Sequence, residues 1–465
     1  MRTLLLLAAC LFFKLATADI YLPSIIGSHM VLQQHSDITL WGWCDPQEPI
    51  EIKTSWDTVT YKTMGNNYAS WKINIRTPDA GGPYTVELTG YNNILLEDVM
   101  LGEIWLCGGQ SNMAFSANNG ITQALDEAPN ASNQKMRFFF VHETCSETLQ
   151  ENCLGEWKVC TPDEMKRFSA VGYFFGQELQ RQLNFPIGLI NANWGGTPAE
   201  VWTPAALVEQ DSLLKQSEGK LWTSDEWWPV KPGVCYNAMI HPISAFKITG
   251  VIWYQGESNT DAAFTYQKLF KTLIQAWRDA WKTELPFYYV QIAPFSGYQG
   301  RFSGALLREA QMQCLNIPNT GMVVIHDLIT NVNEIHPQNK KDVGIRLANY
   351  ALSEHYNVAA IPHKSPVFKN MEVKENLAII EFSNVLTGLK TTEGEPCCFL
   401  IAGEDKQFLP AEATISGDKV IVSNRKIKKP VAVRFAFSNA EIPNLFTNES
   451  LPVASFRTDI WELEK

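Results

Sequence analysis

Beyond its first 18 residues the sequence has no long hydrophobic run. It also has no uninterrupted run of three or more basic residues and no Cys-x-x-Cys pair. A helix that crosses a membrane needs about 18 consecutive apolar residues, so no membrane partner is expected. The net charge of −11 is spread along the chain, which argues against nucleic acid as a partner. The missing Cys-x-x-Cys pair argues against a structural zinc site. Internal repeats and low-complexity segments are also absent from the sequence.

The N-terminus has the pattern of a secretory signal peptide. Arg2 precedes an apolar run over residues 4–13, and Ala16-Thr17-Ala18 supplies the small residues of a cleavage site. We therefore predict a signal peptide over residues 1–18, with Asp19 as the first residue of the mature chain. The predicted location is the secretory pathway, and the sequence leaves secretion and the lysosome open.

Ten cysteines less Cys10 leave nine in the predicted mature chain. Disulfides are expected in an oxidising compartment, and an odd number leaves at least one thiol free or paired between chains. Cys145, Cys153 and Cys160 are close enough in sequence for one local bridge. Cys107 lies in a predicted central strand, where a small buried apolar residue is expected.

Two tripeptides match the Asn-x-Ser/Thr pattern of N-glycosylation. They are Asn130-Ala131-Ser132 and Asn448-Glu449-Ser450. Each pattern is short and weak by itself, but a signal peptide makes the modification plausible. We predict glycans at Asn130 and Asn448.

The length of 465 residues and a changing hydrophobic pattern predict three regions after the signal peptide. Residues 19–98 alternate apolar and polar positions between turns, which favours a β-rich domain. Residues 99–360 alternate apolar runs with helical patterns, which favours a doubly wound α/β domain with a mainly parallel sheet. Residues 361–465 return to short strands, which favours a second β-rich domain. The apolar runs predicted as buried strands cover residues 104–107, 138–141, 187–191, 251–254, 287–292 and 322–325.

The segment 106–113 carries the most informative pattern of the chain. An apolar run ends in Gly108 and Gly109, and Gln110 and Ser111 follow. Two glycines after an apolar strand indicate a tight turn, because glycine tolerates backbone angles that a Cβ forbids. A serine held there can present its hydroxyl to a substrate and its N–H to a developing oxyanion. The alternative is an ordinary strand-to-helix turn with serine as the helix N-cap.

A hydrolytic serine needs a base and donors for the oxyanion, and both are expected at the carboxyl ends of neighbouring strands. Residues 191–198 follow an apolar run and contain Gly195 and Gly196. Either glycine could supply an oxyanion donor through its N–H. The alternative is a plain glycine turn that ends a strand.

Residues 253–260 also follow an apolar run and place several polar side chains around one glycine. Packing alone is a poor explanation for so many polar groups at the end of a strand. Gln255 or Asn259 could supply a further oxyanion donor through its amide. Glu257 is expected to order the loop rather than to act as a base.

The base is predicted in the segment 333–340, which precedes a helical pattern. His336 is the natural candidate, because imidazole titrates near neutral pH. His142, His241 and His326 are rivals by position. A histidine directly before a proline can also be purely structural.

Several motifs in this chain resemble those of the sialate O-acetylesterases in the SGNH (GDSL-like) hydrolase superfamily. The motifs that carry the resemblance are residues 108–113, 253–259 and 335–337 with Asn339-Lys340, supported by 29–33, 236–242 and 308–311. The resemblance implies that acetyl groups are removed from sialic acid hydroxyls, at O9 and secondarily at O4, without a metal or cofactor. The substrates would be O-acetylated sialoglycans or free acetylated sialic acid; no oligomeric state is indicated.

The resemblance also implies roles for individual residues. Ser111 would be the nucleophile and His336 the base. The oxyanion donors would be the Ser111 N–H, an N–H at Gly195 or Gly196, and the amide of Gln255 or Asn259.

The chain departs from the superfamily at the acid of the triad. The superfamily places an aspartate three residues before the histidine, and this chain has Asn333 there. Three substitutes stay open: Glu334, which is close in sequence; Asp327, which follows a predicted strand; and a backbone carbonyl that orients His336. Loss of the acid need not abolish turnover, because the oxyanion hole and substrate binding retain much of the rate acceleration.

Substrate recognition is assigned to two residues. Trp227 lies in the polar, tryptophan-rich segment 221–229, which could form a lid that stacks on a sugar ring. The alternative is a loop anchored by buried tryptophan. Arg308 could pair with the carboxylate of sialic acid, or with a nearby acid that holds a helix in place.

Two other functions compete with the sialic acid esterase. One is an acetylesterase for other acetylated glycans, such as plant polysaccharides, because the same residues would serve. The other is a secreted glycan-binding protein that has lost catalysis, which Asn333 favours. The presence of both Ser111 and His336 argues for the enzyme.

Overall fold

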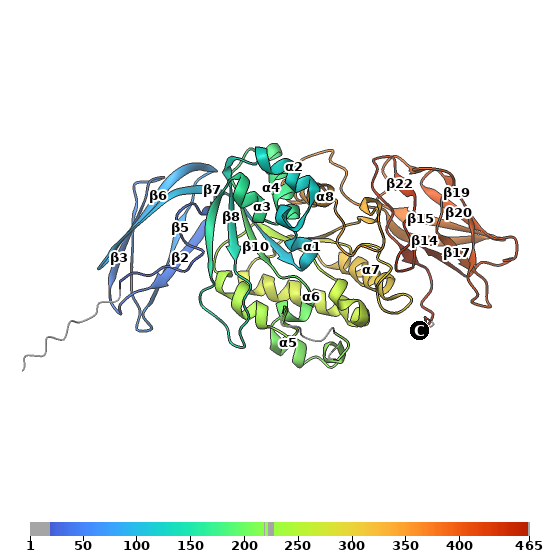
Figure 1. Cartoon of the computed structure of the whole chain (residues 1–465), viewed down its shortest axis with the longest axis horizontal. Coiled ribbons are helices and arrows are strands. Elements are labelled where there is room, and N and C mark those ends of the chain that lie inside the picture. Colours follow the sequence, from blue (N-terminus) through green and yellow to red (C-terminus); the bar gives the residue numbers. More distant parts are fainter. Residues whose placement is uncertain (1–18, 218, 222–226, 464–465) are drawn as a thin grey trace, which may run out of the picture.

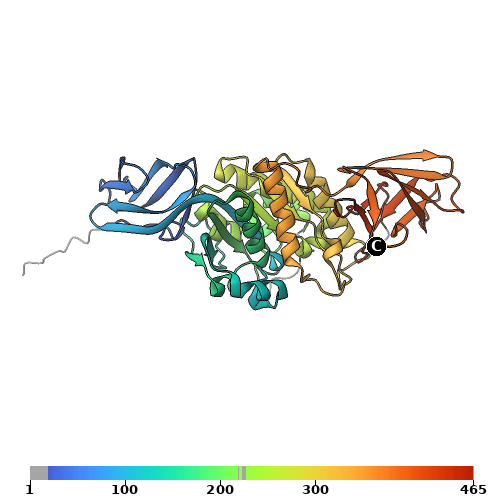
Figure 2. The same cartoon turned by 90° about the horizontal axis from the view of Figure 1, so that it is seen from above.

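The computed structural model describes residues 19–217, 219–221 and 227–463. The predicted signal peptide lies outside these residues. The chain forms an elongated molecule in which an N-terminal β region, a central α/β region and a C-terminal β region follow one another (Figures 1 and 2). Within the described ranges no helix has the length and hydropathy that a membrane crossing requires.

The N-terminal region consists of two groups of antiparallel strands. Alternation in the sequence produces it: along β2 every second residue is buried, and the others face outward. One group pairs β2 with β5, and the other joins β3, β4, β6 and the start of β7. The strand bounds are β1 Val31–Gln33, β2 Asp37–Trp43, β3 Pro49–Thr54, β4 Thr60–Met64, β5 Ser70–Arg76, β6 Gly81–Thr89 and β7 Asn93–Gly109.

Strand β7 joins the N-terminal region to the central region. Its first half pairs with β6, and its second half lies between the parallel strands β10 and β11. Burial follows the same division, since residues 99–109 of β7 are all buried and residues 93–98 are mostly not. The predicted boundary between residues 98 and 99 therefore falls inside a continuous strand.

The central region is built on a mixed sheet in the order β13-β12-β11-β7-β10-β8-β9. All neighbours are parallel except the edge strand β9, which is antiparallel to β8. Each of the six apolar runs predicted as buried strands overlaps one of its strands. The bounds are β8 Asn133–Val141, β9 Gly155–Cys160, β10 Ile187–Asn193, β11 Gly250–Tyr254, β12 Phe287–Val290 and β13 Thr320–Val323.

Helices cover both faces of the central sheet, because the strands are apolar on both sides. Leu106 of β7 belongs to the core that includes α6 and α7, whereas its neighbour Cys107 belongs to the core that includes α4 and α8. The helix bounds are α1 Ser111–Ala114, α2 Thr122–Glu127, α3 Pro162–Arg167, α4 Ala170–Leu183, α5 Ala205–Glu209, α6 Ala263–Trp281, α7 Ser303–Gln313 and α8 Lys340–Tyr350.

The C-terminal region consists of small antiparallel sheets around a separate apolar core. It is joined to the central region partly through Arg457, whose guanidinium forms two 2.8 Å bonds with the Glu309 carboxylate of α7. The strand bounds are β14 Val367–Lys374, β15 Leu377–Ser383, β16 Leu389–Thr391, β17 Phe399–Ala402, β18 Leu409–Pro410, β19 Glu412–Ser416, β20 Lys419–Ser423, β21 Ala432–Phe435, β22 Leu445–Thr447 and β23 Phe456–Arg457.

The cysteines differ from the expectation of disulfides. All nine cysteines in the described ranges are free, so the local bridge expected among Cys145, Cys153 and Cys160 does not form in this structure. Cys153 and Cys160 are buried while Cys145 is exposed. Cys107 is fully buried as expected. Both predicted glycosylation sites, Asn130 and Asn448, are exposed at the surface, and their modification stays a prediction.

Candidate active site

Three predicted segments meet at the carboxyl ends of adjacent parallel strands. In the sheet register, Gly109 at the end of β7 pairs with Asn193 of β10 on one side and with Tyr254 of β11 on the other. The segments that follow these three residues therefore begin side by side. This is the edge where ligands bind in open α/β sheets.

Gly109 allows the chain to turn from β7 directly into α1. Its φ of +133° lies where side chains are strongly disfavoured. A Cβ at this position would also collide with the carbonyl oxygen of Tyr254. The glycine thus lets β11 approach the turn and places Ser111 as the first residue of α1.

Ser111 lies within hydrogen-bond distance of His336. The Nε2 atom of His336 is 2.9 Å from the Ser111 Oγ. The ring of Phe115 stacks on the imidazole with centroids 4.2 Å apart, which fixes its plane. Burial lowers the pKa of His336, and the positive charge of Lys340 lowers it further. The imidazole is therefore neutral near pH 7, as a general base must be.

Glu334 is the acid that the structure brings closest to His336. Its Oε1 is 3.6 Å from Nδ1 of the imidazole and accepts the His336 backbone N–H at 3.0 Å. Asp327 instead binds Arg346 through both carboxylate oxygens. Asn333 accepts a 2.6 Å hydrogen bond from the hydroxyl of Ser296. Of the two carboxylates proposed from the sequence, only Glu334 faces the histidine.

Two backbone N–H groups are available beside Ser111. A Cβ on Gly195 would lie 3.5 Å from the Cβ of Ser111, so these two backbones are in close contact. Among the residues that the structure describes, neither the Ser111 N–H nor the Gly195 N–H has a backbone or side-chain acceptor. Gly196 is packed against the ring of Trp228. The pair Ser111 and Gly195 fits the geometry of an oxyanion hole.

The amides of Gln255 and Asn259 are not placed as expected. Gln255 donates to the carbonyl of Thr197 at 3.3 Å and to Oδ1 of Asn259 at 2.7 Å, which uses both hydrogens of its amide. Asn259 donates to Glu200 and accepts the N–H of Ala199. Both side chains are fully buried. They brace the loop after β11 and do not point to an oxyanion in this structure.

Of the two residues expected to bind substrate, Arg308 is turned away from the site, and Trp227 lies beside Trp194, the residue before Gly195. Residues 222–226 of the predicted lid lie outside the described residues. Arg308 is only 3% exposed, and its guanidinium donates to the backbone carbonyls of Ala293 and Ser438. It cannot meet a sialic acid carboxylate in this arrangement. The side chain of Trp227 is 74% exposed, while its carbonyl accepts the indole N–H of Trp194 at 2.8 Å.

The rival histidines are separate from Ser111. His326 is buried, and one of its ring nitrogens is 3.0 Å from the carbonyl oxygen of Val453. Burial lowers its pKa to about 4. His142 is exposed, and His241 hydrogen bonds to the carbonyl of Gln150.

A family model described as carbohydrate esterase, sialic acid-specific acetylesterase, matches residues 101–353 of the chain. The chain belongs to this family. The matched region contains both Ser111 and His336. The chain is thus a carboxylic ester hydrolase, in agreement with the sequence-based prediction.

Named relatives of this esterase cover most of its length. The sialate O-acetylesterase of Homo sapiens is 28% identical over 398 residues, which is 77% of this chain and 76% of the relative. The enzyme of Mus musculus is 28% identical over 484 residues, 89% of each chain. A solved carbohydrate acetylesterase from Xanthomonas citri is 35% identical, with a TM-score of 0.87, and the match covers 95% of this chain and 100% of that one.

Beneath the serine and histidine, the esterase contains a buried polar cluster that sequence reasoning missed. Asn112 donates to Glu257 at 2.6 Å and to the carbonyl of Ile335 at 3.0 Å. Its Oδ1 accepts a 2.5 Å hydrogen bond from Lys340. The residue after the nucleophile is therefore bonded to the residue before the histidine. We name Asn112, Glu257 and Lys340 the brace cluster.

The charges of the brace cluster are shaped by its burial. Asn112, Glu257 and Lys340 are all fully buried. Burial raises the pKa of Glu257 and lowers the pKa of Lys340 to about 7. The ammonium of Lys340 also lies 5.2 Å from the centre of the Tyr254 ring. The positive charge of Lys340 is thus buried, and it lowers the pKa of His336.

Proposed function

We propose that the protein is a serine esterase that removes O-acetyl groups from sialic acids, at O9 and secondarily at O4. The proposal rests on the 2.9 Å contact between Ser111 and His336 at the carboxyl ends of the parallel strands. The named sialate O-acetylesterases support the choice of sialic acid. We also propose that the central region has the doubly wound sheet of the SGNH hydrolases.

In the first half-reaction Ser111 attacks the acetyl carbonyl. Nε2 of His336 accepts the hydroxyl proton as the Oγ–C bond forms, and the carbonyl oxygen becomes an oxyanion. The N–H groups of Ser111 and Gly195 donate to that oxyanion. The bond between the sugar oxygen and the acetyl carbonyl carbon then breaks. The sugar oxygen takes the proton from His336, and the sugar leaves as an alcohol. An acetyl ester of Ser111 remains.

Water completes the reaction by the same groups. His336 accepts a proton from water as its oxygen attacks the acetyl-serine carbonyl, and the same two N–H groups hold the second oxyanion. Collapse releases acetate, and His336 returns its proton to the Ser111 Oγ. Glu334 stabilises the imidazolium formed in both steps from the side of Nδ1.

Acetate release from 9-O-acetylated and 4-O-acetylated sialic acid tests this function. Ser111→Ala and His336→Ala should each lower kcat/KM by at least about 10³-fold. His142→Ala is the matched control, because His142 is exposed and was a rival base; its rate should equal that of the wild type. Full turnover by folded Ser111→Ala would overturn the assignment of the nucleophile.

A second substrate class is favoured by the Xanthomonas citri structure, which is described as a carbohydrate acetylesterase without reference to sialic acid. Acetylated xylan and acetylated glucomannan should therefore be measured beside the sialic acid esters. We expect the highest kcat/KM with 9-O-acetylated sialic acid. A higher kcat/KM with a polysaccharide, abolished in Ser111→Ala, would support the serine esterase mechanism but contradict sialic acid as the substrate.

A further inference from the structure

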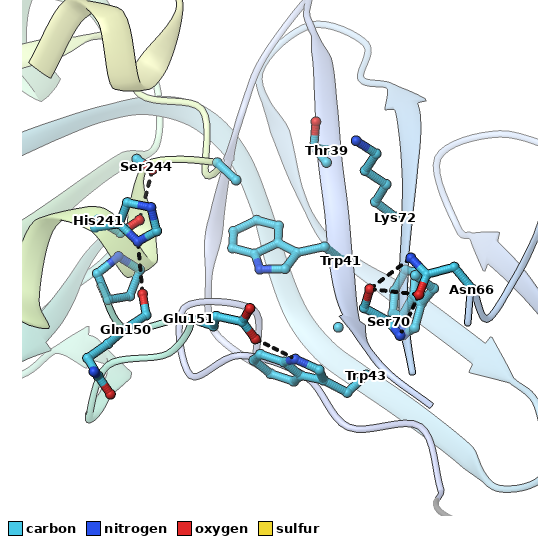
Figure 3. A pocket seen from close by; sticks show the side chains of 14 residues that line it. Thr39, Trp41, Trp43, Asn66, Ser70, Lys72, Gln150, Glu151, His241 and Ser244 are labelled. Atoms are coloured by element: carbon cyan, nitrogen blue, oxygen red, sulfur yellow. Dashed lines mark hydrogen bonds between the residues drawn. The ribbon is translucent and has the colours of Figure 1, made fainter. Parts of the chain in front are cut away.

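A second concave site lies between the N-terminal and central regions. One wall is formed by strands β2 and β5, and the other by residues 150–151 and 241–245 (Figure 3). The cavity has a volume of about 430 Å³, within the range of about 300–1,000 Å³ typical of small-molecule sites. None of its lining residues belongs to the Ser111–His336 site or the brace cluster.

Two tryptophans on β2 give the first wall its aromatic character. Trp41 and Trp43 lie on the outward face of the strand, because burial alternates along β2 and its intervening residues are buried. In the register with β5, Trp41 is opposite Lys72 and Trp43 is opposite Ser70. The indole of Trp41 extends from its strand into the space between the two walls (Figure 3).

The second wall supplies hydrogen-bonding groups in fixed orientations. The Nδ1 of His241 is 2.9 Å from the carbonyl oxygen of Gln150. Since a carbonyl only accepts, Nδ1 carries the proton and Nε2 of the neutral ring is left as an acceptor. Glu151 accepts the indole N–H of Trp43 at 3.2 Å, which ties the two walls together.

The rest of the lining is largely polar. Asn66, Ser70, Lys72 and Ser244 contribute side chains with nitrogen or oxygen atoms beside Trp41 (Figure 3). A lining of this kind favours a ligand with oxygen atoms over a purely apolar one.

We propose that this cavity binds a neutral pyranose ring of a glycan, stacked on Trp41. A pyranose has a face of C–H groups that fits the electron-rich face of an indole, and an edge of hydroxyls that both donate and accept. The wall residues offer both functions. Lys72 and Glu151 carry opposite charges in the same cavity, so a neutral ring fits the lining better than a strongly charged one.

The cavity would hold one sugar of a glycan while another sugar of the same glycan is deacetylated at Ser111. The choice of a carbohydrate rests on the proposed function, but binding at this cavity does not require Ser111. The two proposals can therefore fail separately, provided that binding is measured without turnover.

Saturation-transfer NMR of lactose with the full-length Ser111→Ala chain tests the proposal. Lactose is the probe because it offers neutral pyranose rings without an acetyl ester. Trp41→Ala should lower lactose affinity by at least about tenfold, since the stacking face is lost. Trp41→Phe keeps an aromatic face and should retain measurable binding. Tyr68→Ala is the matched control, because Tyr68 is an exposed aromatic residue of the same region outside the cavity.

Each outcome decides the proposal. Loss of binding in Trp41→Ala with retention in Tyr68→Ala, both variants folded by circular dichroism, supports it. If Trp41→Ala does not fold, Lys72→Ala replaces it, because Lys72 is exposed in the cavity wall and should also weaken lactose binding. Absence of lactose binding to the Ser111→Ala chain, or equal binding by the cavity variants, overturns it, whatever the esterase assay shows.

Discussion

Glu334 is an unusual partner for a catalytic histidine, because its side chain is 49% exposed and its oxygen is 3.6 Å from Nδ1. An exposed carboxylate interacts through solvent of high dielectric constant, so its attraction for the imidazolium is weak. By contrast, a buried acid in hydrogen-bond contact would make a strong, charge-assisted bond. The histidine here is positioned mainly by its contacts with Phe115 and Ser111.

We predict that Glu334→Gln lowers kcat/KM only about tenfold, far less than Ser111→Ala. The reason is that solvent screens the lost charge, and a screened interaction weakens further as salt rises. The rate ratio of wild type to Glu334→Gln should therefore shrink between 0.05 M and 1 M NaCl, because the Debye length falls from about 14 Å to about 3 Å.

Asp327→Asn is the comparison for this variant. Asp327 was the other candidate acid, but it is bonded to Arg346. Its replacement should leave kcat/KM unchanged while lowering the urea midpoint of unfolding. A larger rate loss in Asp327→Asn than in Glu334→Gln would contradict the assignment of Glu334.

At the scale of elements, the sequence pattern predicted the strands well and the loops poorly. A strand buried on both faces leaves a local apolar run, so each run from residue 104 to 325 overlaps a strand. Helix α8 begins at Lys340, directly after its N-cap Asn339, whose side chain accepts the N–H of Asp342. Apolar periodicity alone does not locate this first residue, because the N-cap is a polar residue outside the apolar pattern.

The direction of a side chain in a loop depends on partners that are distant in sequence. Ser111, Gly195 and His336 converge because parallel strands end at one edge, which a sequence can predict. Gln255 was assigned from its place after an apolar run and from the family resemblance, and Arg308 from its charge. The first donates to the carbonyl of Thr197 and the second to that of Ser438, both distant in sequence. The brace cluster was missed for the same reason, since its three members come from three separate segments.

The brace cluster links α1, the loop after β11 and helix α8. We predict that the substitution Lys340→Met in this cluster changes the pH dependence of the esterase. Lys340 lowers the pKa of His336, so loss of its charge should raise that pKa. Activity requires neutral His336 and is lost as pH falls through this pKa. The acid limb of kcat/KM should therefore move to higher pH, with little change in rate at pH 8.

Lys341→Met is the matched control, because Lys341 is the adjacent exposed lysine. Its acid limb should coincide with that of the wild type. Loss of one partner from a buried charged pair is destabilising, so the double variant Lys340→Met/Glu257→Gln keeps the test available if the single variant unfolds. An acid limb that moves to lower pH in either Lys340 variant would show that Lys340 does not act on His336 by its charge.

At the scale of the whole molecule, the two β regions are attached to the central region in different ways. The N-terminal region shares strand β7 with the central sheet, so the connection is continuous backbone. The C-terminal region is held by contacts between separate segments, including Arg457 with Glu309 and Phe295 N–H with the Asn439 carbonyl at 2.8 Å. Side-chain and backbone hydrogen bonds between separate segments therefore contribute to the stability of the second junction.

Arg308 belongs to that second junction, and we predict that Arg308→Met lowers stability without changing substrate choice. Its guanidinium bonds to Ser438 of the C-terminal region, and unsatisfied buried carbonyls cost about 1–3 kcal/mol. The urea midpoint should fall, as it should in Arg457→Met, but not in the exposed control Arg425→Met. The ratio of kcat/KM for 9-O-acetylated sialic acid to that for 4-nitrophenyl acetate should stay constant. A selective loss for the charged sugar would instead place Arg308 on its carboxylate, against the buried position in the structure.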